Sequence, residues 1–196
     1  NKMTLVFIDC EASGPCIGMG ELTEFGAVIY KTKKTFYGDM RMKTLFGKML
    51  TMRYFLDWIQ ENCDSRPVFV SDNPAFDWQW INYWFHHTLG MNPFGWSARR
   101  IGDYYAGLKD NFQRSTDWKR LRVTKHDHHP VNDAMGNVEA FEAMQLKLKL
   151  KLEKQEKEKE AEEDLDKIFI NPHPSDGGTG DYDTYNAEDY IIGRFA

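Results

Sequence analysis

The sequence has few cysteines and no long apolar segment, and each absence argues against a class of protein. Its cysteines, Cys10, Cys16 and Cys63, form no even set and no CxxC pair, so we expect no disulfide framework and a reducing, cytoplasmic location. No apolar run reaches about 18 residues, which argues against a membrane span. The N-terminal segment becomes acidic at Asp9, too soon for a secretory signal.

The net charge of −5 conceals two segments of opposite sign. Residues 1–152 hold 20 Lys and Arg against 17 Asp and Glu, whereas residues 153–196 hold 5 against 13. The N-terminal part is therefore mildly basic, and an acidic C-terminal part masks this. A basic surface is compatible with a nucleic-acid partner but does not require one.

A chain of 196 residues with 41% hydrophobic residues predicts one domain and an appendage. We expect the domain over residues 1–150, a charged helical extension over 151–170 and an acidic tail rich in Gly and Tyr over 171–196. The tail is a candidate for contact with a protein partner or for self-association. The sequence leaves the oligomeric state open.

Hydrophobic patterns predict strands that first form an antiparallel meander and then alternate with helices. The expected elements are strands at 4–9, 23–30 and 35–42, a helix at 50–62, a strand at 67–71, a helix at 75–89, a short strand or helix start within 97–108, a loop at 109–127 with a helical turn near 118–121, and a helix from 134 toward 167. This order predicts an α/β fold, with a mixed sheet flanked by helices.

Two acids, Asp9 and Glu11, lie at the end of the first predicted strand and just beyond it. Residues two apart in a strand point to the same face, so these carboxylates project together and repel each other. A divalent cation is the usual remedy for such a pair. Solvent-facing acids on an edge strand are the competing interpretation, but the apolar run before Asp9 indicates a buried strand.

Two further acids, Asp77 and Asp133, lie at the starts of predicted helices. Each taken alone is explained by the helix dipole, and Asn132 is a candidate cap for the second helix. His128 lies on the loop before Asp133, and a loop histidine with a pKa near ~6.5 suits a general base.

The histidine-rich run has a second interpretation as a structural zinc site. His126, Asp127, His128 and His129 are all residue types that bind zinc. Such a site would make the protein a zinc-stabilised interaction module rather than an enzyme. A structural site needs four well-placed ligands, and the cysteines lie far away in the sequence.

These acids and their surroundings resemble the DEDDh group of 3′→5′ exonucleases, which are DnaQ-like or RNase T-like enzymes with a ribonuclease H-like fold. The resemblance covers roughly residues 3–145, and within the group it is similar to phage exonuclease A and related exoribonuclease-like domains. The matching motifs are Asp9-Cys10-Glu11-Ala12-Ser13-Gly14, Asn73-Pro74-Ala75-Phe76-Asp77 and His128-His129-Pro130-Val131-Asn132-Asp133-Ala134. One departure is Pro130, where the family pattern has Ala, and it is expected to stiffen the histidine loop.

The resemblance implies a five-stranded sheet and a two-metal mechanism that releases nucleoside 5′-monophosphates. Asp9, Glu11 and Asp133 would bind one Mg²⁺ or Mn²⁺ ion, Asp9 would bridge to a second, and Asp77 would reach that second ion. His128 would act as the general base. A catalytically idle domain that binds nucleic acid or a polymerase is the alternative.

A 3′→5′ exonuclease must also bind a single-stranded end, through phosphate charge and base stacking. Residues 99–125 carry eight cations against three acids, although a solvated basic loop explains this equally well. The aromatic residues of the helix at 75–89 are more typical of a core. The candidate substrate contacts are Ala12, Ser13, Gly14, Asn73, Phe76, Arg99, Arg100, Lys119, Arg122 and Lys125. The choice between DNA and RNA stays open, because no residue indicates recognition of a 2′-hydroxyl.

Overall fold

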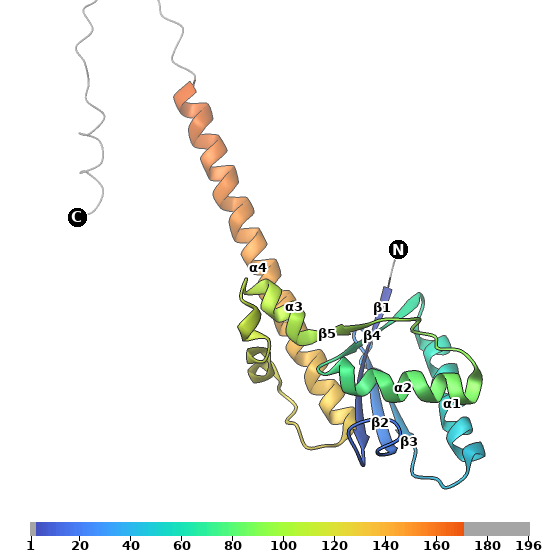
Figure 1. The fold of residues 1–196 in the computed structure, drawn as a ribbon. Coiled ribbons are helices and arrows are strands. Elements are labelled where there is room, and N and C mark those ends of the chain that lie inside the picture. Colours follow the sequence, from blue (N-terminus) through green and yellow to red (C-terminus); the bar gives the residue numbers. More distant parts are fainter. Residues whose placement is uncertain (1–2, 171–196) are drawn as a thin grey trace, which may run out of the picture. The chain divides into compact units, whose positions relative to one another are not determined.

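The computed structural model describes residues 3–170, and its centre is a five-stranded mixed sheet with the order β3-β2-β1-β4-β5 (Figure 1). The strands are β1 (Met3–Ala12), β2 (Leu22–Ile29), β3 (Thr35–Asp39), β4 (Arg66–Ser71) and β5 (Ala98–Arg100). The first three form the antiparallel meander, while β4 runs parallel to both β1 and β5. This confirms the predicted α/β fold with a ribonuclease H-like sheet.

Helices cover the two faces of this sheet (Figure 1). The helices are α1 (Leu45–Asn62), α2 (Pro74–Leu89), α3 (Ile101–Leu108) and α4 (Pro130–Ile170), with short 3-10 turns at η1 (Phe112–Arg114) and η2 (Asp117–Leu121). Along β1, Val6, Ile8 and Cys10 pack with residues of α1 and α2, whereas Phe7 packs with α3 and α4. Because strand side chains alternate, Asp9 and Glu11 continue the face of Phe7, toward α4.

Two helices begin earlier than their apolar spacing predicts. Helix α1 begins at Leu45, because the Thr44 hydroxyl caps it by accepting a hydrogen bond from the amide of Gly47 at 3.1 Å. Helix α4 begins at Pro130 rather than at 134, and proline is well suited to a first helical position. Asn132 therefore lies inside α4, and its expected role as a cap was wrong.

The chain divides after Lys151, and the residues up to that point form one compact unit. Helix α4 continues past this point, and its side chains from Leu152 to Leu165 are exposed. The predicted acidic tail over 171–196 lies outside the described residues. Within residues 3–170, no helix has the length and apolarity needed to cross a membrane.

Candidate active site

Five acidic side chains from distant parts of the chain meet beside the carboxyl-terminal ends of β1 and β4. One carboxylate oxygen from each of Asp9, Glu11 and Asp133 lies within 4.8 Å of the other two, and Asp9, Asp72 and Asp77 form a second group in the same way. Asp9 belongs to both groups. The four acids predicted from the sequence are thus brought together, with Asp9 at their centre.

Asp9 is the most strongly perturbed acid of the cluster. Its side chain is 9% exposed, and burial followed by repulsion from Asp77 and Asp133 raises its pKa to about 9. Without a cation, a group of this kind retains a proton at neutral pH. A bound divalent ion would favour the ionised form of Asp9 instead, because its positive charge would be the largest local charge in the site.

Asp77 is held by hydrogen bonds from outside its own helix. Its carboxylate accepts one from the hydroxyl of Ser71 on β4 and one from the amide of Cys10 on β1, the latter at 3.0 Å. Burial raises the pKa of Asp77 to about 7, although both hydrogen bonds act in the opposite direction. The side chain is therefore oriented toward β1 and β4, which a role limited to the helix dipole does not require.

Asp133 presents a buried oxygen that lacks a hydrogen-bond donor. Its side chain is 1% exposed, and its Oδ1 accepts a hydrogen bond from the amide of Asp127 at 3.2 Å. The Nδ1 of His126 lies 2.6 Å from Oδ2, but the contact does not have the alignment of a hydrogen bond. Because a buried acceptor without a donor is costly, this oxygen fits a metal ligand.

A glycine on β2 allows α4 to approach Asp9. Gly26 pairs with Asp9 across the two strands, and a Cβ on Gly26 would lie 2.3 Å from the backbone of Pro130 and Val131. The first turn of α4 can therefore rest directly on β2. This close approach places Asp133 beside the carboxylate of Asp9.

His128 lies over the acidic cluster on an exposed loop. Its side chain is 74% exposed, and its Nδ1 is 3.6 Å from Oε1 of Glu11. Burial raises the pKa of Glu11, and the positive charge of a protonated His128 opposes this shift. The ring is thus close enough to exchange a proton with a water molecule bound at the cluster, as a general base must.

Asp72 is a member of the cluster that the sequence interpretation missed. It follows β4 directly, and its Oδ2 also pairs with Nζ of Lys119 at 2.9 Å and with a guanidinium nitrogen of Arg122 at 3.3 Å. The available signal was its position at the end of a buried strand, as for Asp9.

The predicted phosphate-binding cations fall into two groups. The cations of the first group already have partners within the protein. Arg122 is nearly buried against Trp118 and donates a hydrogen bond to Asn137. Lys119 pairs with Asp72, and Arg100 pairs with Asp103. Arg99 and Lys125 are exposed and form no ion pair within the described residues. Arg99 and Lys125 are therefore more accessible than Arg122 to a phosphate.

The glycine-containing loop after β1 is closed on itself and tied to α2. The amide of Ser13 donates to the carbonyl of Glu21 at 2.9 Å, and the side chain of Gln79 bonds to both Ile17 and Pro15. Backbone of Gly14 touches that of Gly20, where a Cβ would lie 2.4 Å away. The neighbouring candidates Ala12, Ser13, Gly14, Asn73 and Phe76 are all at least partly exposed, and their contacts with substrate stay a prediction.

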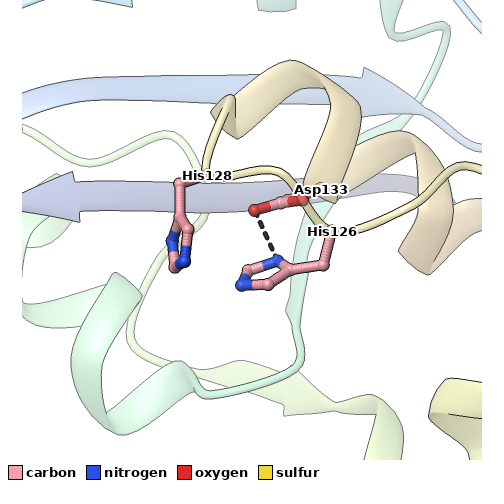
Figure 2. Close-up of side chains that lie close together, drawn as sticks. All are labelled: His126, His128 and Asp133. Atoms are coloured by element: carbon pink, nitrogen blue, oxygen red, sulfur yellow. Dashed lines mark ion pairs between the residues drawn. The ribbon is translucent and has the colours of Figure 1, made fainter.

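The four residues of the alternative zinc site do not share one centre. Asp127 accepts hydrogen bonds from the amide of His129 and the side chain of Asn132, and the ring of His129 stacks on Tyr37. His126 and His128 instead lie beside Asp133 (Figure 2).

No family model matches the chain. It is 31% identical over 170 residues to the 3′-5′ DNA exonuclease Cap18 of Escherichia coli, an alignment that covers 72% of this chain and 91% of the relative. Since this identity spans nearly all of the relative and accompanies the mixed sheet and the acidic cluster, the chain belongs to the family of DEDD-type 3′→5′ exonucleases.

Proposed function

We propose that this protein hydrolyses single-stranded DNA from its 3′ end and releases nucleoside 5′-monophosphates. The observation that carries the proposal is the meeting of Asp9, Glu11, Asp77 and Asp133 at the carboxyl-terminal ends of β1 and β4. DNA is the preferred substrate because the relative is a DNA exonuclease. RNA is the competing substrate.

Two divalent cations fit this arrangement of oxygens, and Mg²⁺ or Mn²⁺ prefers such ligands. Asp9, Glu11 and Asp133 would hold one ion, and Asp9 and Asp77 the other. Asp133 Oδ2 supports the first assignment because it is buried without a donor. When bound, the two ions would activate the attacking water and neutralise charge on the leaving 3′ oxygen.

The remaining chemistry belongs to side chains around the cluster. His128 would accept the proton of the attacking water, and its exposed loop position leaves room for that water. Ser71 and the amide of Cys10 would keep Asp77 oriented toward the second ion. Arg99 and Lys125 are the exposed cations that we assign to the phosphates of the DNA strand.

Residues 1–150 would be sufficient for this activity, because every assigned side chain lies within them. The extension over 151–170 would be dispensable for hydrolysis. A chain truncated after Lys151, where the compact unit ends, tests this division. It should retain the activity of the full chain on short DNA.

Digestion of end-labelled oligonucleotides tests the proposal directly. Single-stranded DNA and RNA of one sequence, labelled at the 5′ end, are incubated with the protein and Mg²⁺ or Mn²⁺. We expect a ladder of DNA products shortened from the 3′ end, which Asp9→Asn abolishes. Equal activity in Asp9→Asn, or shortening from the 5′ end, would contradict the mechanism.

The same experiment separates the competing interpretations. Faster digestion of RNA than of DNA would identify RNA as the preferred substrate. Binding of DNA without digestion at either metal ion would favour a catalytically idle domain. Gel-shift measurements on the same samples provide that comparison.

A further inference from the structure

A group of metal-binding side chains lies beside the acidic cluster and contains a residue with no role in the proposed reaction. The group consists of His126, His128 and Asp133, and one ligand atom of each residue lies within 4.8 Å of the other two. The two imidazole rings are 4.4 Å apart between centroids, and Nδ1 of His126 is 2.6 Å from Oδ2 of Asp133. Figure 2 shows both rings on the same side of the loop, next to the Asp133 carboxylate.

The loop that carries the two histidines is held at both ends. Before it, the carboxylate of Glu139 accepts hydrogen bonds from the amides of Val123 and Thr124 at 3.0 and 2.6 Å, and from the Thr124 hydroxyl at 2.9 Å. After it, Asp127 accepts hydrogen bonds from the amide of His129 and the side chain of Asn132. The backbone of the loop is therefore organised, and it holds both rings beside the Asp133 carboxylate.

The conformation of His128 brings its ring back toward His126. Its φ of +61° lies in the left-handed region, which residues other than glycine rarely adopt. Such a conformation persists where the surrounding structure enforces it, and it is common at functional sites. Here it places two imidazoles and one carboxylate around a single small space.

Two imidazoles and one carboxylate match the preferences of Zn²⁺ better than those of Mg²⁺. Tetrahedral zinc holds such atoms about 3.4 Å apart, which follows from bonds of about 2.1 Å. The rings of His126 and His128 can turn to that spacing, and Asp133 supplies a fixed oxygen. This oxygen is buried and accepts no hydrogen bond, and Nδ1 of His126 lies 2.6 Å from it.

We propose that His126, His128 and Asp133 form a zinc site whose occupation inhibits the exonuclease. A zinc ion there would take Asp133 away from the Mg²⁺ or Mn²⁺ site and would bind the ring of His128, the proposed base. Zinc and the catalytic ion at Asp133 therefore exclude each other. The inhibition rests on the proposed function, whereas the binding of the ion does not.

Titration with Co²⁺ tests the binding without any measurement of activity, because tetrahedral Co²⁺ absorbs visible light. The full chain is first stripped of metal with EDTA. We expect the wild type to bind one Co²⁺ at this site with visible absorption, and Zn²⁺ to displace it. His126→Ala should weaken the binding by more than about tenfold, since removal of even an outer-shell partner typically costs that much. The matched control is His129→Ala, whose ring stacks on Tyr37 outside the site.

Activity measurements then test the inhibition. At constant Mg²⁺, Zn²⁺ should stop DNA digestion by the wild type and by His129→Ala, and excess Mg²⁺ should relieve it. His126→Ala should digest DNA as the wild type does without Zn²⁺ and should resist inhibition by Zn²⁺. Equal Co²⁺ binding and equal inhibition in His126→Ala and the wild type would overturn the proposal. If the wild type digests no nucleic acid but binds Co²⁺, and His126→Ala loses that binding, the zinc site stands and only the proposed function fails.

Discussion

Gly26 and Asp9 pair with each other across β2 and β1. Because Gly26 has no side chain, the first turn of α4 can occupy the position that a Cβ would take. The peptide between Pro130 and Val131 fills the position of a Cβ on Gly26. The distance between Asp9 and Asp133, and with it the first metal site, therefore depends on a residue that carries no functional group.

Gly26→Ala should lower both stability and metal-dependent activity. A methyl group 2.3 Å from backbone atoms forces α4 away from β2, and overpacking of this kind costs about 1–3 kcal/mol. Thermal unfolding and digestion of labelled DNA measure the two effects. The matched control is Gly107→Ala in α3, where a Cβ meets nothing within 4 Å. This control should be neutral or slightly stabilising, and equal behaviour of the two variants would contradict the role of Gly26.

The metal-free protein should lose stability as the pH rises from about 4 to about 9. Burial raises the pKa of Asp9 to about 9 and that of Asp77 to about 7, so the folded state binds more protons than the unfolded state across this range. The contribution of these two carboxyl groups to the free energy of unfolding is full at and below their unfolded pKa values. It is lost as the groups ionise in the folded protein. Thermal unfolding in EDTA measures the decrease, and Asp9→Asn should flatten it.

Mg²⁺ should raise the melting temperature more at pH 8 than at pH 5. The carboxylates must release their protons to bind the ion, so protons and metal compete for Asp9 and its neighbours. Paired melting curves with Mg²⁺ and with EDTA at each pH provide the test. A pH-independent effect of Mg²⁺ would show that the ion binds elsewhere.

Ser71→Ala should weaken metal binding by about 10- to 100-fold, because the hydroxyl of Ser71 orients Asp77 from outside the metal's own ligands. Loss of this hydrogen bond also raises the pKa of Asp77 further, since Ser71 acts to lower it. The Mg²⁺ concentration that gives half-maximal digestion reports the change. Ser65→Ala, at a hydroxyl paired with Thr4 on another part of the sheet, is the control and should leave this concentration unchanged.

His128→Ala should reduce turnover by about 10²- to 10⁴-fold with little change in Mg²⁺ affinity. Its ring lies near Glu11 but is not among the four carboxylates assigned to Mg²⁺. Single-turnover digestion and titration of Mg²⁺ separate the two quantities. The exposed His87 on α2 offers a control in His87→Ala, and an unchanged rate in His128→Ala would remove this residue as the base.

Arg122 and Lys125 should respond in opposite ways to substitution. Arg122→Ala removes the donor to the buried Asn137 and leaves Asp72 paired with Lys119 alone, so it should cost about 1–3 kcal/mol of stability. Lys125→Ala should leave the melting temperature unchanged, weaken DNA binding and reduce the salt dependence of log K by about 1. Binding at several salt concentrations, together with thermal unfolding, distinguishes the two roles. If the salt dependence of DNA binding changed in Arg122→Ala and not in Lys125→Ala, Arg122 rather than Lys125 would be the residue that binds phosphate.

The order of the elements and the main acids follow from local patterns in the chain. The apolar run before Asp9 indicates a buried strand, and the two-residue spacing to Glu11 places both acids on one face, because strand geometry repeats every two residues. Asp77 and Asp133 were recognised only as members of an ordered set of motifs. Read singly, each is an ordinary acid at a helix start.

Tertiary packing alone decided what those residues meet. It brought Asp72 into the cluster, turned Arg122 inward to that acid, and set His126 against Asp133. Each of these contacts joins different elements of the fold or the two ends of a folded loop, and none follows from helix or strand periodicity. They depend on how closely the elements approach, and at Gly26 that approach is determined by the absence of a single methyl group.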